Sequence, residues 1–346
     1  MYLIKIIFFI LFSFLTASEV DVNYYDAFVK VVKYNENSYI KGFQELKENN
    51  ISVIRINGSG FYFAKDWKFY INHKKEYFKL LDEFINNAEK YDIKIIFDFF
   101  WRYSAIANLE KESIQQAYGN TESKSFRFMK TYIQEVVNRY KNSKAILMWE
   151  IGNEYNLKIN LPCKRVKKFI KKCKKDDVFT YNTYDNLMEN LIAFIKKLDN
   201  KHMVSTGNSI PRIYVYKKKI NNENYKKILK EIIMKENKYS DVISLHLYPW
   251  TLKKRVFMKY FKDFSDFISF VKSISLKYKK HLLIGEFGFC KIKDFYERKE
   301  KFFEYMLAFK KNKIDYTLIW VFDRKKDKIC NVNLKELVYL RKFLYE

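Results

Sequence analysis

From about residue 25 to its C-terminus, the chain alternates between two patterns of apolar and polar positions. The first is a short run that is apolar almost throughout, such as 93–99 or 242–247. Such runs are typical of strands buried on both faces of a sheet. The second pattern repeats apolar residues every three or four positions, as in 74–90, where Leu81 and Phe84 share one face. This spacing predicts an amphipathic helix that packs on a core.

These segments predict eight units of strand followed by helix. Strands are expected over 28–32, 51–56, 93–99, 145–151, 202–205, 242–247, 282–286 and 316–322, and helices over 38–49, 74–90, 123–140, 184–198, 223–235, 260–278, 296–311 and 334–345. Eight such units are typical of a (β/α)8 TIM barrel in the α/β class. A doubly wound open sheet is the alternative, but it needs a glycine-rich phosphate-binding turn, and 57–60 is only a weak candidate. We expect one domain over 25–346.

The first 18 residues differ from the rest. A short start containing Lys5 is followed by an apolar run over 6–15 and by small residues up to Ser18. This order is typical of a secretory signal peptide over 1–18, and the run is too short for a comfortable membrane span. We therefore expect a secreted or periplasmic protein, with an uncleaved membrane anchor as the alternative.

Export permits disulfide bonds, and the chain contains four cysteines without the paired spacing of a zinc site. We favour Cys163–Cys173, which would close the loop after the fourth strand. We also favour Cys290–Cys330, because the loops after the neighbouring seventh and eighth strands can meet. Four free thiols are the alternative.

The formal net charge is +26, and most of the excess is lysine spread over the predicted helices. Solvated helix faces explain most of it, and electrostatic association with an anionic surface is the alternative. The aromatic residues, 19% of the chain, follow the periodicity of a core, and no nucleic-acid-binding motif is present, so we expect no nucleic acid partner. Lysines are dense in 161–175, which is either a solvated loop or a guide for an anionic or surface-attached glycan.

A glutamate stands at or just after the end of two of the apolar runs. Glu154 follows the run over 145–151, and Glu286 ends the run over 282–286. A carboxylate is costly to bury alone, so two such endings suggest a site. The carboxyl ends of barrel strands meet on one face, where the active sites of such barrels lie. Two carboxylates in one cleft are what glycoside hydrolysis requires.

Further candidates lie at the same strand ends. They are Arg55, Asp98, Trp101, Asn153, His246, Tyr248 and Trp320. Glu150, four residues before Glu154, is expected to point inward or to pair with a lysine. Trp149 is expected to pack between strand and helix.

Together these residues resemble the motifs of glycoside hydrolase family 5, the cellulase and mannanase family of clan A barrels. The resemblance is carried by Trp-Glu-Ile-Gly-Asn-Glu over 149–154, His-Leu-Tyr over 246–248 and Gly-Glu-Phe-Gly over 285–288, together with Arg55 and Trp320. It covers about residues 25–345. Each motif is moderately specific, and their order and spacing make the match strong.

The resemblance implies two roles for the glutamates, the acid/base for Glu154 and the nucleophile for Glu286. Glu154 must then be protonated before attack, which requires a raised pKa. Glu286 must stay ionised, which Arg55 and the Tyr248 hydroxyl would favour.

The resemblance also implies sugar contacts. Asn153 would bond to the 2-hydroxyl, Trp320 would lie under the sugar ring, and His246 would orient the acid/base or contact hydroxyls. Trp101, Arg55 and Tyr248 complete the substrate-binding set. We expect no metal and no cofactor, because two carboxylates suffice.

Two departures from the family pattern indicate a divergent member. The third strand ends in Asp-Phe-Phe-Trp over 98–101, where cellulase-like members often have His, and Tyr155 stands where Pro often follows the acid/base. The expected substrate is a β-linked poly- or oligosaccharide of the β-mannan or β-glucan type. A catalytically inactive barrel that binds glycans is the alternative, and the sequence leaves the sugar, endo or exo action and the oligomeric state open.

Overall fold

The structure is a computed structural model that describes residues 20–166, 173–216, 224–254 and 257–338. Eight parallel strands form one sheet in the order β5-β4-β3-β2-β1-β8-β7-β6. They are β1 (Asp21–Asn23), β2 (Val53–Asn57), β3 (Lys94–Phe100), β4 (Ile146–Gly152), β5 (Met203–Ser205), β6 (Val242–Leu247), β7 (His281–Phe287) and β8 (Tyr316–Ile319). The edge strands β5 and β6 approach each other where the Asp241 N–H donates to the Val204 carbonyl at 3.0 Å. The sheet is therefore a nearly closed (β/α)8 barrel, as predicted.

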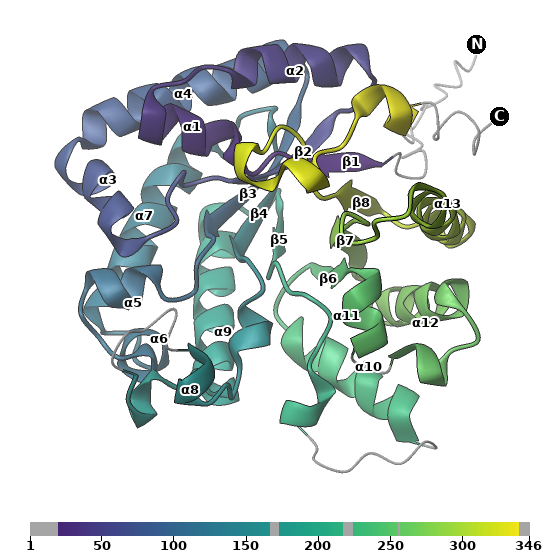
Figure 1. The fold of residues 1–346 in the computed structure, drawn as a ribbon. Helices are drawn as coiled ribbons and strands as arrows, with labels where there is room; N and C mark the ends of the chain where they lie inside the picture. Colours follow the sequence, from purple (N-terminus) through teal and green to yellow (C-terminus); the bar gives the residue numbers. More distant parts are fainter. Residues whose placement is uncertain (1–19, 167–172, 217–223, 255–256, 339–346) are drawn as a thin grey trace, which may run out of the picture.

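Helices surround the strands (Figure 1). They are α1 (Asp26–Tyr34), α2 (Tyr39–Glu48), α3 (Lys68–Asn72), α4 (Lys74–Lys90), α5 (Ala105–Leu109), α6 (Ile114–Gly119), α7 (Lys124–Tyr140), α8 (Cys163–Val166), α9 (Tyr181–Leu198), α10 (Tyr225–Glu236), α11 (Pro249–Lys254), α12 (Phe264–Lys277) and α13 (Phe295–Lys311). The large helices match the predicted ones to within a few residues, and the predicted helix over 334–345 begins at Leu334. Its part beyond residue 338 and the predicted signal peptide lie outside the described residues.

The first strand was predicted in the wrong place. Residues 28–32 belong to helix α1, and the strand is the shorter β1 that precedes it. Several valines made the segment resemble a strand, yet Ala27, Phe28 and Val31 are buried at helical spacing. The last strand also ends at Ile319, earlier than predicted.

The barrel interior has two layers with different chemistry. Near the amino ends of the strands, apolar side chains fill it: Ile96, Met148, Val242, Leu283, Tyr316 and Leu318. One or two residues further along, the buried side chains are polar: Asn23, Arg55, Asp98, Glu150, Ser205, Ser244 and His246. An apolar plug thus supports a polar layer at the carboxyl face, where barrel enzymes carry their sites.

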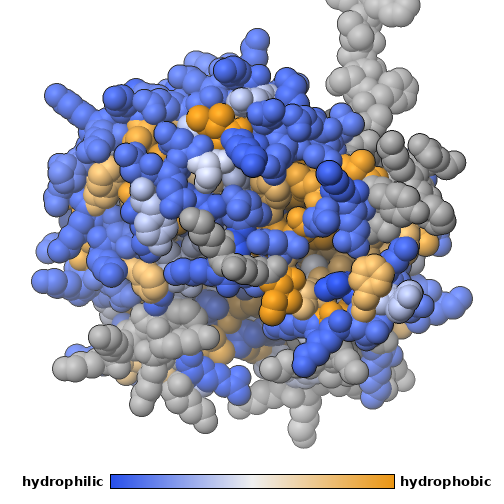
Figure 2. Space-filling model, turned by 45° about the horizontal axis from the view of Figure 1, so that its top comes forward, coloured by the Kyte–Doolittle hydropathy of each residue, from blue (hydrophilic) through white to orange (hydrophobic). Residues whose placement is uncertain are grey.

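A second, aromatic-rich core lies between the sheet and the helices. Trp149 stacks on Phe99 with ring centroids 5.4 Å apart, and its indole N–H donates to Asp199 at 2.9 Å. The outside is mostly hydrophilic, with scattered apolar patches on the face drawn in Figure 2. Among the described residues, no helix is long and apolar enough to cross a bilayer.

Candidate active site

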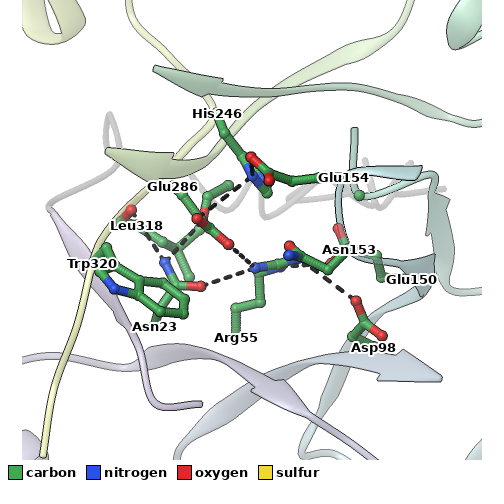
Figure 3. A network of polar contacts seen from close by, with 12 residues as sticks. Asn23, Arg55, Asp98, Glu150, Asn153, Glu154, His246, Glu286, Leu318 and Trp320 are labelled. Carbon is green, nitrogen blue, oxygen red and sulfur yellow. Dashed lines mark hydrogen bonds and ion pairs between the residues drawn. The ribbon is translucent and has the colours of Figure 1, made fainter. Parts of the chain in front are cut away.

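The buried guanidinium of Arg55, on β2, organises the polar layer (Figure 3). Its Nε donates to Glu150 at 2.5 Å, Nη1 to Glu286 at 2.9 Å and Nη2 to the Asn153 amide oxygen at 2.8 Å. Asp98 lies 3.6 Å from Nη2. The fork geometry of arginine allows one side chain to fix several acceptors at once. Arg55 thus orients groups from β4 and β7 together.

Glu286, at the end of β7, is 5% exposed and held from two sides. One carboxylate oxygen accepts from Arg55, and the other accepts from the Tyr248 hydroxyl at 2.8 Å. Burial and the charge of Glu286 raise the pKa of Tyr248 well above its usual value, so this hydroxyl keeps its proton and donates. Two donors stabilise the ionised carboxylate, which is the state that a nucleophile needs.

Glu154 follows β4 in a left-handed backbone conformation, with φ 54° and ψ 36°. Non-glycine residues adopt this conformation at a cost, and such residues are frequent in functional sites. Its N–H donates to the Gly207 carbonyl at 2.8 Å. A Cβ at residue 207 would lie 1.9 Å from the Gly152 carbonyl, so only glycine fits this contact.

His246, on β6, lies between the two glutamates. Its Nδ1 is 3.2 Å from Glu154 and 3.6 Å from Glu286. Burial alone would raise the pKa of Glu154, but the hydrogen bond and charge of His246 and the charge of Lys158 lower it to about 2. The prediction of a raised pKa for Glu154 is therefore wrong: its neighbours lower this pKa.

The two glutamates are close together. Oxygens of Glu154 and Glu286, with a ring nitrogen of His246, all lie within 4.8 Å of one another. Retaining glycosidases hold their carboxyl groups about 5–5.5 Å apart and inverting ones about 6.5–9.5 Å. The closest approach of the two carboxylates is thus nearer to the spacing of retaining enzymes than to that of inverting ones.

Aromatic side chains form one wall of the site. Trp320, half-buried after β8, lies 6.2 Å from Trp101 and 6.2 Å from Tyr25, between ring centroids. Trp101 is 6% exposed, and the Arg55 guanidinium lies 4.5 Å from its ring. Trp320 therefore offers a surface for a sugar ring, whereas Trp101 mainly packs against Arg55 and the aromatic wall.

Among the described residues, Glu154, His246 and Glu286 also form the group that could hold a metal ion. Arg55 argues against this use, because its guanidinium lies 2.9 Å from Glu286 and would repel a cation. The donor set fits acid–base chemistry better than metal binding.

The structure adds residues that were not in the predicted set. Asn23 on β1 accepts from Arg55 at 3.1 Å and donates to the Gly285 carbonyl at 2.9 Å. Glu150 points inward and pairs with Arg55 rather than with a lysine. Trp250 stacks on Tyr248 with centroids 4.7 Å apart. Of these three, Glu150 was expected to point inward or to pair with a lysine, and Trp250 had a signal as an aromatic residue two positions after Tyr248, whereas Asn23 had none.

The loops around the site carry both predicted disulfides, Cys163–Cys173 and Cys290–Cys330. The second joins the segments after β7 and β8, close to Trp320. The centre of the lysine-rich loop, 167–172, lies outside the described residues.

Comparison with known proteins identifies relatives of this barrel. The family model described as "Cellulase (glycosyl hydrolase family 5)" matches residues 16–326. A probable mannan endo-1,4-beta-mannosidase A-2 of Aspergillus terreus is 27% identical over 184 residues, which cover 48% of this chain and 41% of that protein. Mannan endo-1,4-beta-mannosidase F of Aspergillus clavatus is 32% identical over 133 residues, 37% of this chain and 26% of that protein. The matched part thus spans less than half the length of these curated relatives.

Solved structures share the fold. The endo-1,4-beta-D-mannanase of Thermotoga petrophila superimposes with a TM-score of 0.64 at 16% identity, covering 94% of this chain and 99% of that one. Endoglucanase Cel5A of Thermotoga maritima gives a TM-score of 0.53 at 18% identity, with coverages of 87% and 89%.

Proposed function

The chain belongs to glycosyl hydrolase family 5, and from this premise we propose that it cleaves a β-1,4-linked mannan or a related β-glucan with retention of anomeric configuration. One observation carries the mechanism: oxygens of Glu154 and Glu286 lie within 4.8 Å of each other at the ends of two barrel strands. The names of the fungal relatives favour mannan as the first substrate to test.

In the first step, a Glu286 oxygen attacks the anomeric carbon, and the bond to the leaving sugar breaks. Glu154 gives its proton to the departing oxygen, and a covalent glycosyl-enzyme remains. In the second step Glu154, now a carboxylate, takes a proton from water. The water oxygen attacks the same carbon and releases Glu286.

The surrounding residues serve these steps. Arg55 and the Tyr248 hydroxyl stabilise ionised Glu286 before attack and again when it leaves. Asn153, which accepts a hydrogen bond from Arg55, would bond to the 2-hydroxyl, and Trp320 would lie under the reacting ring. With its pKa lowered to about 2, Glu154 is ionised at neutral pH, so its role as proton donor requires that a bound sugar raise this pKa by excluding water and loosening the contact with His246.

Glutamine substitution tests the proposal. Glu154→Gln and Glu286→Gln should each lower turnover of β-mannan by at least about a thousandfold while the fold stays intact. Glu76→Gln is the control, because Glu76 is an exposed residue of α4. Activity of Glu286→Gln close to that of the wild type would refute the assignment. A wild-type protein that binds mannan or glucan without cleaving it would instead be the inactive glycan-binding barrel.

We also propose that the protein is exported. The pattern of residues 1–18 and the two disulfides support this location. N-terminal sequencing of the mature protein should begin near residue 19, and an intact Met1 would point to a retained anchor.

A further inference from the structure

Ser205, at the end of β5, joins two parts of the candidate active site, and its side chain is buried. The hydroxyl donates to Glu150 Oε2 at 2.8 Å and accepts from the Gly207 N–H at 3.1 Å. A serine hydroxyl has one proton to donate and lone pairs that accept, so both hydrogen bonds exist at once. Ser205 therefore links a buried carboxylate to the backbone of the segment 205–209.

The carboxylate on one side of this link is itself fixed. Glu150 Oε1 accepts from Arg55 Nε at 2.5 Å, and both side chains are buried. Hydrogen bonds between two charged groups are among the strong ones in proteins. Glu150 also lies against Gly207, because a Cβ at residue 207 would be 2.9 Å from Glu150 Cδ. Ser205 is thus anchored to a carboxylate that cannot turn away without breaking an ion pair.

The backbone on the other side of the link holds Glu154. The Gly207 carbonyl accepts from the Glu154 N–H at 2.8 Å. Two residues further on, the Ser209 N–H donates to the Asn156 side chain at 3.1 Å, and the Ser209 carbonyl accepts from it at 2.6 Å. A hydrogen bond from the Ser209 hydroxyl also contributes to the lowered pKa of Glu154. These contacts hold residues 154–156 against the segment 205–209.

Both ends of the contact between Gly207 and Glu154 have a left-handed backbone, with φ 68° at Gly207 and 54° at Glu154. Glycine adopts this conformation freely, whereas a glutamate needs surrounding contacts to keep it. A serine hydroxyl that accepts from the N–H two residues ahead closes a local turn. In this turn the Gly207 carbonyl is directed toward Glu154.

We propose that Ser205 is a positioning residue for the acid/base: its hydroxyl connects Glu150 to the turn at Gly207 and so holds Glu154 where it protonates the departing oxygen. The inference rests on the proposed function and deepens it, because it adds a residue that acts on one glutamate of the pair. In Ser205→Ala, the Gly207 N–H loses its partner inside a buried layer, which is costly. The segment 205–209 should then shift, and Glu154 with it.

The leaving group of the substrate tests this role. Phenol is a poor leaving group that needs a proton from the acid, whereas dinitrophenol departs without one, so a misplaced acid slows the phenyl substrate alone. Ser205→Ala should lower kcat/KM for phenyl β-mannobioside at least about tenfold and for the dinitrophenyl compound less than about threefold. Ser205→Thr keeps the hydroxyl and should stay within about threefold of wild type on both.

Ser240→Ala is the matched control. Ser240 is buried before the amino end of β6, and its hydroxyl lies 3.1 and 2.7 Å from the Asn237 and Val242 carbonyls. This variant should keep the wild-type ratio between the two substrates. If Ser205→Ala does not fold, Ser205→Cys replaces it, because a thiol of similar size forms only weak hydrogen bonds. An equal loss on both substrates, or no loss, overturns the proposal.

Amide hydrogen exchange separates this proposal from the proposed function. Exchange of the Glu154 and Gly207 N–H groups, followed by NMR on the folded protein, should be at least about tenfold faster in Ser205→Ala than in wild type. It should be unchanged in Ser240→Ala. Equal rates in Ser205→Ala and wild type overturn the role of Ser205. If wild type cleaves neither mannobioside, the proposed function on mannan fails, while the exchange rates still decide whether Ser205 holds Glu154.

Discussion

Glu154 and Glu286 come from β4 and β7, and their carboxylate oxygens nevertheless lie within 4.8 Å of each other, with His246 between them. The barrel creates this proximity, because the carboxyl ends of all its parallel strands open on one face. Arg55 and Tyr248 fix one member of the pair, and His246 contacts both. Their environments differ, which is the condition for one carboxylate to attack and the other to donate a proton.

The distance between the carboxylates predicts the stereochemistry of the product. We expect the first product to retain the β configuration, since this spacing is nearer to that of retaining enzymes than to that of inverting ones. Proton NMR of the anomeric signal in the first minutes of hydrolysis measures this directly. An initial α product would contradict the double displacement.

Local patterns predicted much of this architecture. The helix over 74–90 and the strand over 242–247 have the predicted bounds, because their apolar spacing matches what the barrel buries. The two glutamates, Arg55 and Tyr248 could be assigned to one face because strand ends converge there.

Other features depend on tertiary contacts and could not be predicted. The short β1 carries too few residues for a periodic signal, so Asn23 was missed. The lowered pKa of Glu154 comes from His246 on another strand. Its left-handed backbone is accompanied by a hydrogen bond from the Glu154 N–H to the carbonyl of Gly207, which follows the neighbouring strand β5. None of these partners is near in sequence.

His246→Asn should change the pH dependence of kcat/KM. A proton donor must be neutral, and His246 is the main group that lowers the pKa of Glu154, to about 2 together with Lys158, so the fraction of protonated Glu154 in free enzyme falls as pH rises above that value. Asparagine removes the charge, which raises the pKa and moves the alkaline limb to higher pH. Exposed His73→Asn serves as control. An alkaline limb that stays in place would contradict the assigned role of His246.

Asp21→Asn should remove a pH dependence of stability. Burial raises the pKa of Asp21 from 3.8 to about 7, against the hydrogen bond from the Val53 N–H. Between those values the unfolded chain loses this proton while the folded protein keeps it, so stability falls as pH rises, by up to about 4 kcal/mol. Urea unfolding at pH 4.5 and 7.5 should show a smaller difference for Asp21→Asn than for wild type. Exposed Asp92→Asn should behave as wild type.

The Cys290–Cys330 disulfide should stabilise the segment that holds Trp320. Within this segment, the Val321 N–H donates to the Cys330 carbonyl at 3.0 Å, and the Trp320 indole donates to Asp327 at 3.0 Å. Replacing both cysteines by serine should destabilise the protein by about 2–4 kcal/mol and raise KM. Thermal unfolding and steady-state kinetics measure the two effects. The Cys163/Cys173 double variant, which opens a loop of shorter separation, should lose less stability, and the reverse order would contradict this reasoning.

Asp98→Asn should keep most of the activity. Arg55 faces three buried carboxylates, Glu150, Glu286 and Asp98, and one cation cannot compensate three charges in a dry site. Asp98 makes the longest contact, 3.6 Å, and burial together with the charge of Glu150 raises its pKa well above the usual value. If Asp98 is neutral, the positive charge of Arg55 is shared only by the carboxylates of Glu150 and Glu286.

Asparagine imitates that neutral acid, so kcat/KM should change less than about threefold and the pH profile should stay the same. Glu150→Gln is the contrasting variant, because it removes the 2.5 Å partner of Arg55 and should cost at least about a hundredfold in kcat/KM. At pH 8, where Asp21 has lost most of its proton, infrared difference spectra should show the carbonyl band of a protonated carboxylic acid in wild type but not in Asp98→Asn. A hundredfold loss for Asp98→Asn with no such band in wild type would mean that Asp98 is ionised and that the charge assignment around Arg55 is wrong.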